Sequence, residues 1–399
     1  MLFSDVIGQD TIKQHLAEMV EHNRLSHALL FLAKEGAGGL PLALAFAQYI
    51  VSLPAEAPVV EDLFGGMTAL EPSGGFIPPE QIANESAYIR AAKLVHPDLH
   101  FTYPVIPRKS GDKPVSADYI EEWRSFVDTM PYGNVYDWLQ SIGAENKQGN
   151  ITAEECNQII RALSLKSFES RYKVLLLWMP EYLGKEGNKL LKLIEEPPPN
   201  TVFILVAENE ESILPTILSR CQLVRIPALE DADIEKALID RAKASEETAR
   251  QITGICEGNY REALHLLQHA DEDWQSLLRE WLNAMLKTGP AAQLKFIDEV
   301  SRLGREKQKQ FLRYFNHLLE QSIRIRVMGE EQIRVAAEEK DFAKRLNKIA
   351  SVSQQECMIE ELDKAAYYIE RNAHAKMLFQ ALTIKLYHII QNKTLILSK

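Results

Sequence analysis

The sequence feature that most constrains the fold is an apolar run that leads directly into a glycine-rich loop and then into a helical segment. The run Ala28–Leu32 has the character of a buried strand, and Gly36, Gly38 and Gly39 follow it. A strand, a glycine loop and a helix in this order cradle nucleotide phosphates, because backbone N–H groups at the helix N-terminus point at the anion. We therefore expect an α/β protein built on a nucleotide-binding frame.

This loop lacks the two side chains that bind phosphate and magnesium in the motif G-x-x-x-x-G-K-[ST]. Gly39 stands at the lysine position and Leu40 at the hydroxyl position. The absent ammonium would hold the outer phosphates, and the absent oxygen would ligate Mg²⁺. Two interpretations stay open for Gly36, Gly38 and Gly39: a plain tight turn without tight nucleotide binding, or residual nucleotide contact through backbone N–H groups.

Length, charge and cysteine usage narrow the class of protein. A chain of 399 residues is expected to form about two or three domains. Its formal charge of −11 argues against a broad nucleic-acid-binding surface, which needs clustered Lys and Arg. The four cysteines show no C-x-x-C spacing, so we expect a reduced cytoplasmic protein without a zinc site. Neither a signal peptide nor an apolar run of about 18 residues is visible, so no membrane span is expected.

Apolar runs alternate with helical patterns up to Pro227. Residues 174–178, 201–207 and 223–226 read as strands of a parallel sheet. Helices are expected over 10–24, 41–51, 188–196 and 212–220, and another begins at the Thr152–Glu155 capping box.

Two stretches interrupt this alternation. Residues 52–95 contain the pairs Gly65-Gly66 and Gly74-Gly75 and are expected to be irregular. Residues 107–150 are polar but rich in aromatic side chains, which indicates a small packed element rather than disorder.

From Trp274 onward only helical periodicity is found. We predict a core over 1–227 carrying both insertions, a helical lid over 228–272, and an α-helical domain over 273–399.

Several short sequence segments, taken together, resemble the bacterial clamp-loader branch of the AAA+ ATPases, whose members load the sliding clamp for DNA polymerase III. The resemblance covers most of residues 1–270 apart from the two insertions. It implies a P-loop AAA+ core with a parallel sheet, a small helical lid and a C-terminal all-α collar domain. The segments are Ile7–Gln9, Arg24–Phe31, Leu190–Pro198, Leu218–Cys221 and Gly258–Ala263.

Within that family, the residues resemble a subunit that does not hydrolyse ATP. Motor subunits carry an acidic pair after the strand that corresponds to 174–177, and here Trp178 and Met179 occupy those positions. Glu181 follows too late in register to replace them. The resemblance thus implies a stator subunit that is itself non-catalytic within the DNA polymerase III holoenzyme, a nucleotidyltransferase assembly.

Arg220 lies in the phrase Ser219-Arg220-Cys221, which in this family places an arginine finger at the seam with a neighbouring subunit. A guanidinium there would stabilise charge on the γ-phosphate, an effect worth about 10³ to 10⁵ in rate in other nucleotide hydrolases. The alternative is a surface arginine paired with a carboxylate. Cys221 reads as a small buried hydrophobe rather than a nucleophile.

Arg261 resembles the sensor arginine of the lid, which touches the phosphates of the subunit's own nucleotide. Without a nucleotide we expect a structural ion pair, with Glu257 four residues earlier on the same helix. The first sensor position falls near Glu208, where an acidic side chain disfavours phosphate. His96, Asp98 and His100 are not expected to bind a metal, because Pro97 favours an extended segment.

The resemblance implies partners rather than a cofactor of this chain. The partners would be the gamma/tau motor subunits and the delta subunit in a hetero-oligomer, with the sliding clamp and primed DNA contacted through the complex. ATP would be bound by the neighbouring subunits. The alternative is an active ATPase of the motor type, with Lys34 reaching phosphate from the front of the loop and Glu181 as its acid.

Overall fold

The computed structural model divides into two compact units. Unit 1 comprises Met1–Lys243 and Cys256–Leu264, and unit 2 comprises Ala244–Ile255 and His265–Lys399. The domain boundaries expected after 227 and 272 remain predictions. The structure describes residues 1–53, 59–61, 67–69, 77–109, 111–144, 147–268, 274–329, 337–370 and 373–391.

Unit 1 is built on a five-stranded sheet in which every neighbouring pair of strands is parallel, in the order β4-β5-β6-β1-β7. The strands are β1 (Ala28–Ala33), β4 (Leu99–Thr102), β5 (Lys173–Trp178), β6 (Thr201–Ala207) and β7 (Gln222–Ile226). Strand β1 lies between β6 and β7, and its Leu30 is in register with Leu205 and Leu223. The predicted parallel sheet is confirmed, with the glycine loop at the carboxyl end of an inner strand.

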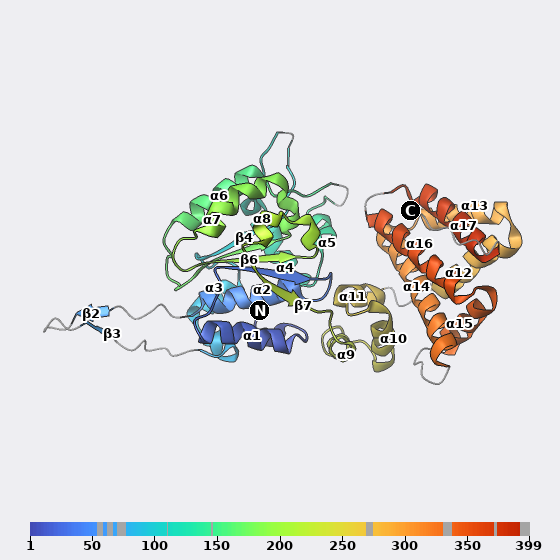
Figure 1. The fold of residues 1–399 in the computed structure, drawn as a ribbon, viewed down its shortest axis with the longest axis horizontal. Helices are drawn as coiled ribbons and strands as arrows, with labels where there is room; N and C mark the ends of the chain where they lie inside the picture. Colours follow the sequence, from blue (N-terminus) through green and yellow to red (C-terminus); the bar gives the residue numbers. More distant parts are fainter. Residues whose placement is uncertain are drawn as a thin grey trace. The chain divides into compact units, whose positions relative to one another are not determined.

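Helices cover both faces of this sheet (Figure 1). Alternate residues of the inner strands β1, β5 and β6 enter two separate cores, as the period of two in a strand requires. Phe31 and Ile204 pack on the face that carries α2 (Gly39–Val51), whose residues are all buried. Leu30 and Leu205 pack on the opposite face with residues of α6 (Ala153–Ser164). The remaining helices of this core are α1 (Asp10–Glu21), α3 (Ser86–Ala92), α4 (Ile120–Thr129), α5 (Val135–Ser141), α7 (Leu191–Glu195), α8 (Pro215–Leu218) and α9 (Asp231–Asp240).

The start of α6 shows half of the predicted capping box. The Thr152 hydroxyl accepts the Glu155 N–H at 3.1 Å, as expected. The Glu155 carboxylate does not return to the cap; it accepts from the Thr102 hydroxyl and from the Ser116 N–H, each at 2.7 Å. Glu155 therefore joins α6 to the end of β4 and to the second insertion.

The second insertion is a packed element, as predicted. Trp123 of α4 and Trp138 of α5 are fully buried, and both rings contact Tyr103, with centroids 4.1 and 5.1 Å away. The first insertion contains an antiparallel pair, β2 (Val59–Glu61) with β3 (Met67–Ala69), before the 3₁₀ helix η2 (Pro79–Asn84) and α3. The Gly65-Gly66 and Gly74-Gly75 pairs lie outside the described residues.

One predicted helix differs in form. Instead of a single helix over 188–196, the chain forms a 3₁₀ segment, η4 (Pro180–Leu190), followed by the short α7. Gly184 interrupts η4 with a φ of 51°, a conformation that glycine adopts at little cost. The predicted helix over 212–220 is likewise shorter, since only Pro215–Leu218 is α-helical.

Unit 2 is all helical in its described residues. Its core centres on Trp281, whose ring lies 5.6 Å from Phe296 and 5.5 Å from Phe311. The amphipathic segment 358–391 predicted to join a bundle forms parts of two helices. None of the described helices is long and apolar enough to cross a membrane. The helices of unit 2 are α12 (Trp274–Asn283), the π-helical η6 (Ala284–Thr288), α13 (Pro290–Ser301), α14 (Arg305–Met328), α15 (Ala337–Ile349), α16 (Val352–Glu370) and α17 (Ala375–Gln391). Two further helices, α10 (Glu246–Cys256) and α11 (Tyr260–Gln268), have residues in both units.

Candidate functional site

The glycine loop joins β1 to α2 at the carboxyl edge of the sheet. Gly36 and Gly38 have φ angles of 69° and 94°, in the left-handed region that favours glycine, so the tight turn is formed as predicted. Gly39 serves close packing instead: a Cβ built there would lie 2.7 Å from the Ala33 Cβ. The chain therefore makes a tight glycine turn between β1 and α2, with Gly39 and Leu40 at the motif positions for lysine and hydroxyl.

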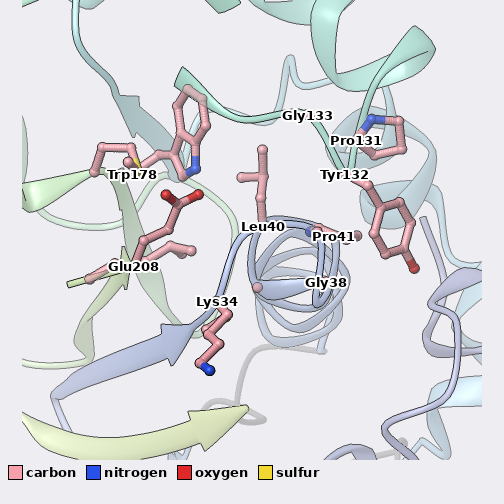
Figure 2. A pocket seen from close by; sticks show the side chains of 15 residues that line it. Lys34, Gly38, Leu40, Pro41, Pro131, Tyr132, Gly133, Trp178 and Glu208 are labelled. Carbon is pink, nitrogen blue, oxygen red and sulfur yellow. The ribbon is translucent and has the colours of Figure 1, made fainter. Parts of the chain in front are cut away.

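Apolar side chains fill the space in front of the loop (Figure 2). Leu40, Trp178 and Met179 are 4%, 2% and 6% exposed, and the Trp178 ring packs 5.2 Å from that of Trp123. The cavity that remains measures about 20 Å³, room for about one water molecule. Ligand pockets typically measure roughly 300 to 1,000 Å³. The positions expected to bear the magnesium-binding acids are thus part of the apolar core.

Tyr132, from the second insertion, packs directly against the loop. Its ring lies 3.2 Å from the point that a Cβ of Gly38 would occupy, and its hydroxyl accepts the Ile7 N–H at 2.7 Å. Tyr260 contacts the same ring edge-on at 5.0 Å. Burial raises the pKa of Tyr132 to about 12, so the hydroxyl is neutral at physiological pH.

Arg261 binds two carboxylates of unit 1. Its Nε and NH2 donate to the two oxygens of Asp137 at 2.5 and 2.7 Å, and its NH1 donates to Glu35 at 3.0 Å. The side chains of Arg261 and Asp137 are each 3% exposed. The expected pair with Glu257 is wrong, because α11 begins at Tyr260 and Glu257 precedes it with a φ of 47°.

The residues just before Arg261 also contact the loop. The Tyr260 N–H donates to the Gly36 carbonyl at 3.2 Å, and the Asn259 amide donates to Glu35 at 3.3 Å. The Asn259 side-chain oxygen lies 1.8 Å from the place where a Gly36 Cβ would be, so only glycine fits there. Glu35 and Gly36 thus accept hydrogen bonds from residues 259–260, which belong to the segment expected to form the lid.

The acidic residues near the loop are arranged for internal contacts. Glu181 accepts the backbone N–H groups of Glu208 and Asn209 at 2.7 and 2.9 Å, and burial raises its pKa. Glu208 lines the small cavity. In Figure 2 the ammonium of Lys34 points away from Leu40 and Trp178. Lys34 and Glu208 both line the cavity, but no ion pair joins Lys34 to Glu208 or Glu181 in the described part of the chain.

Arg220 does not line this cavity; it lies at the end of α8. Its Nε donates to Glu195 at 2.6 Å and NH2 donates to the same oxygen, while NH1 donates to the Thr216 carbonyl at 2.7 Å and to the Ser219 hydroxyl at 3.2 Å. Burial raises the pKa of the Cys221 thiol to about 11, so it is a poor nucleophile at neutral pH.

The motif analysis missed three residues at the site: Glu35, Tyr132 and Asp137. Glu35 was readable as a carboxylate inside a loop that should hold an anion. Tyr132 and Asp137 come from the second insertion, about 100 residues later in the chain, and no spacing in the sequence connects them with the loop.

Two of the three possible metal ligands, His96 and Asp98, make hydrogen bonds within the protein. His96 Nδ1 accepts the Asp98 N–H at 3.1 Å, and Asp98 accepts three backbone N–H groups, from Phe168, Glu169 and Ser170. Within the described residues, no group of three or more His, Cys, Asp or Glu side chains is arranged to hold a metal ion.

The parallel sheet with its glycine loop on an inner strand, together with the C-terminal helical region, defines an α/β protein with a separate all-helical unit. Residues 86–230 match the model of the family described as "DNA polymerase III, delta subunit". Over this part the chain is similar to subunits of DNA polymerase III.

Three curated proteins are similar to parts of this chain. The delta' subunit of Bacillus subtilis is 26% identical over 65% of this chain and 59% of its own length. The delta' subunit of Haemophilus influenzae is 58% identical over 18% of this chain and 23% of its own length. The gamma subunit of Buchnera aphidicola (from Schizaphis graminum) is 35% identical over 29% of this chain and 34% of its own length. The matches therefore span less than two thirds of each relative.

Proposed function

We propose that this chain is the delta-prime type of clamp-loader subunit: a cytoplasmic stator that hydrolyses no ATP and donates Arg220 to the ATP site of a neighbouring motor subunit. The proposed absence of ATP hydrolysis is supported chiefly by the hydrogen bonds that Arg261 donates. A sensor arginine must be available to phosphate, and here Asp137 and Glu35 satisfy it inside the protein.

Three further observations support the absence of nucleotide chemistry in this chain. The cavity at the loop is about 20 Å³, a small fraction of a nucleotide's volume. The motif positions for phosphate and magnesium are Gly39, Leu40, Trp178 and Met179. Glu35 adds a negative charge within the loop itself, and like charges repel most strongly where water is scarce.

The proposed role of Arg220 as an arginine finger rests on the sequence motif around it and on its position in the fold. The residue lies at the end of a short surface helix, and its side chain is 31% exposed. A guanidinium offers a rigid set of donors that remains charged at all physiological pH values, which suits a developing phosphate charge. The partners in this proposal are gamma/tau motor subunits and a delta subunit, with the helical residues 273–399 forming the collar that holds them together. The sliding clamp and primed DNA are contacted through the complex.

The test is ATP turnover by the complex reconstituted with Arg220→Ala. We expect assembly to persist and turnover to lose the contribution of the one site that Arg220 serves. Arg225→Ala is the matched control, since Arg225 is a more exposed arginine nearby in sequence, paired with Glu210 at 3.4 Å. Wild-type ATP turnover by an assembled complex with Arg220→Ala would refute the role of Arg220 as an arginine finger. Equal losses of turnover in Arg220→Ala and Arg225→Ala would indicate a general effect of surface charge and would also contradict that role.

A further inference from the structure

Glu195 holds the guanidinium of Arg220 against its own subunit. Its Oε1 accepts from Arg220 Nε at 2.6 Å and from NH2. The NH1 group is occupied as well, by the Thr216 carbonyl and the Ser219 hydroxyl. Of the five N–H donors of this side chain, four are used within the described residues.

This arrangement leaves Arg220 unable to clamp a phosphate where it stands. Two-point binding of a phosphate needs two adjacent N–H donors that point the same way. In Arg220 the edge formed by Nε and NH2 faces Glu195, and both donors of NH1 are bonded. The guanidinium must therefore leave Glu195 before it can bind a phosphate in a neighbouring subunit.

The bond to Glu195 is suited to such an exchange. The side chains of Arg220 and Glu195 are 31% and 45% exposed, so water screens the pair and its net contribution is small. A phosphate carries more charge than one carboxylate and offers more oxygen acceptors. A triphosphate opposite Arg220 would outcompete Glu195, whereas an empty or diphosphate-bound site would not present the same charge.

We propose that Glu195 is a positioning residue that keeps Arg220 retracted until a neighbouring nucleotide presents its outer phosphate. This inference rests on the proposed role of Arg220. Glu195 competes with the phosphate for one guanidinium, so its removal shifts Arg220 toward the engaged position. Glu195 contributes no group to the reacting atoms.

The experiment compares Glu195→Gln with Glu196→Gln in the reconstituted complex. Glu196 is the adjacent carboxylate, is exposed, and has no ion pair or side-chain hydrogen bond within the described residues, so it controls for the loss of one negative charge. Two quantities are measured. One is ATP turnover, and the other is the affinity of the complex for ADP with aluminium fluoride, an analogue of the phosphoryl-transfer transition state. The second readout is one that a merely structural role would leave unchanged.

We expect Glu195→Gln to raise both quantities at the affected site by about two- to fivefold, the range of an exposed ion pair. Glu196→Gln should match the wild type, and Glu195→Gln combined with Arg220→Ala should match Arg220→Ala alone. If Arg220→Ala lowers turnover but Glu195→Gln leaves it unchanged or lowers it, this inference is wrong while the role of Arg220 stands. If Arg220→Ala itself has no effect, both fail.

Discussion

Arg261 and Asp137 form a two-point ion pair, with Nε 2.5 Å from Oδ2 and NH2 2.7 Å from Oδ1. The pair joins the start of α11 to α5 in the second insertion, and both side chains are 3% exposed. A buried charge that loses its partner is strongly destabilising, since nothing replaces the lost hydration. The insertion therefore helps to hold the start of α11 against the glycine loop.

Removal of one partner should expose this dependence. We expect Asp137→Ala to lower the free energy of unfolding by about 3 to 5 kcal/mol, since it removes the two-point partner of a buried guanidinium. Urea denaturation followed by tryptophan fluorescence measures the change. Glu122→Gln is the control, because its pair with Arg108 at 3.2 Å is exposed and should be worth less than about 1 kcal/mol. Equal effects of the two substitutions would contradict the structural role of Asp137.

Tyr132 gives a prediction about pH. Its pKa in the folded chain is raised from 10.0 to about 12 by burial, so folding favours the neutral hydroxyl. That contribution is complete below pH 10 and is lost as pH rises from about 10 toward 12, because ionisation then occurs first in the unfolded chain. We expect the wild type to lose about 2 kcal/mol more than Tyr132→Phe across that range.

The same variant has an effect at neutral pH. Tyr132→Phe leaves the buried Ile7 N–H without its acceptor, which should cost about 1 to 3 kcal/mol. Urea unfolding of both proteins at pH 7, 9 and 11.5 measures both effects. Parallel curves of stability against pH for the two proteins would contradict the assignment of the raised pKa to Tyr132.

Restoring the motif lysine should not restore nucleotide binding. A Cβ at Gly39 meets the Ala33 Cβ at 2.7 Å, so Gly39→Lys should destabilise the fold by about 1 to 3 kcal/mol through overpacking. The small cavity and the carboxylate of Glu35 remain. A thermal shift assay with and without ATP and Mg²⁺ checks this, with Lys34→Ala as a control for the alternative lysine. Saturable stabilisation of Gly39→Lys by ATP would show that the loop lacks only its cation.

The sequence predicted the fold well where the signal was local. The apolar runs at 28–32, 174–178 and 201–207 are strands of one parallel sheet, because strands buried on both faces have continuous apolar sequence. Gly36 and Gly38 adopt the left-handed conformations expected of glycines in a tight turn. These features depend on neighbours in the chain, which a motif records.

The contacts that complete the site depend on residues far apart in the chain. The partners of Arg261 lie 124 and 226 residues earlier, so the nearest acid on the sequence, Glu257, was the wrong expectation. The bond between Arg220 and Glu195 spans 25 residues and links two phrases that were each recognised separately. A polar side chain takes the partner that the tertiary fold brings near, and only the three-dimensional structure supplies that.

The most direct test of the account is calorimetric titration of the isolated chain with ATP and Mg²⁺. With Arg261 engaged by Asp137 and Glu35 and a cavity of about 20 Å³ at the loop, we predict no saturable binding up to millimolar ATP. Tight, magnesium-dependent binding, lost on Lys34→Ala, would contradict the account and favour an active ATPase of the motor type.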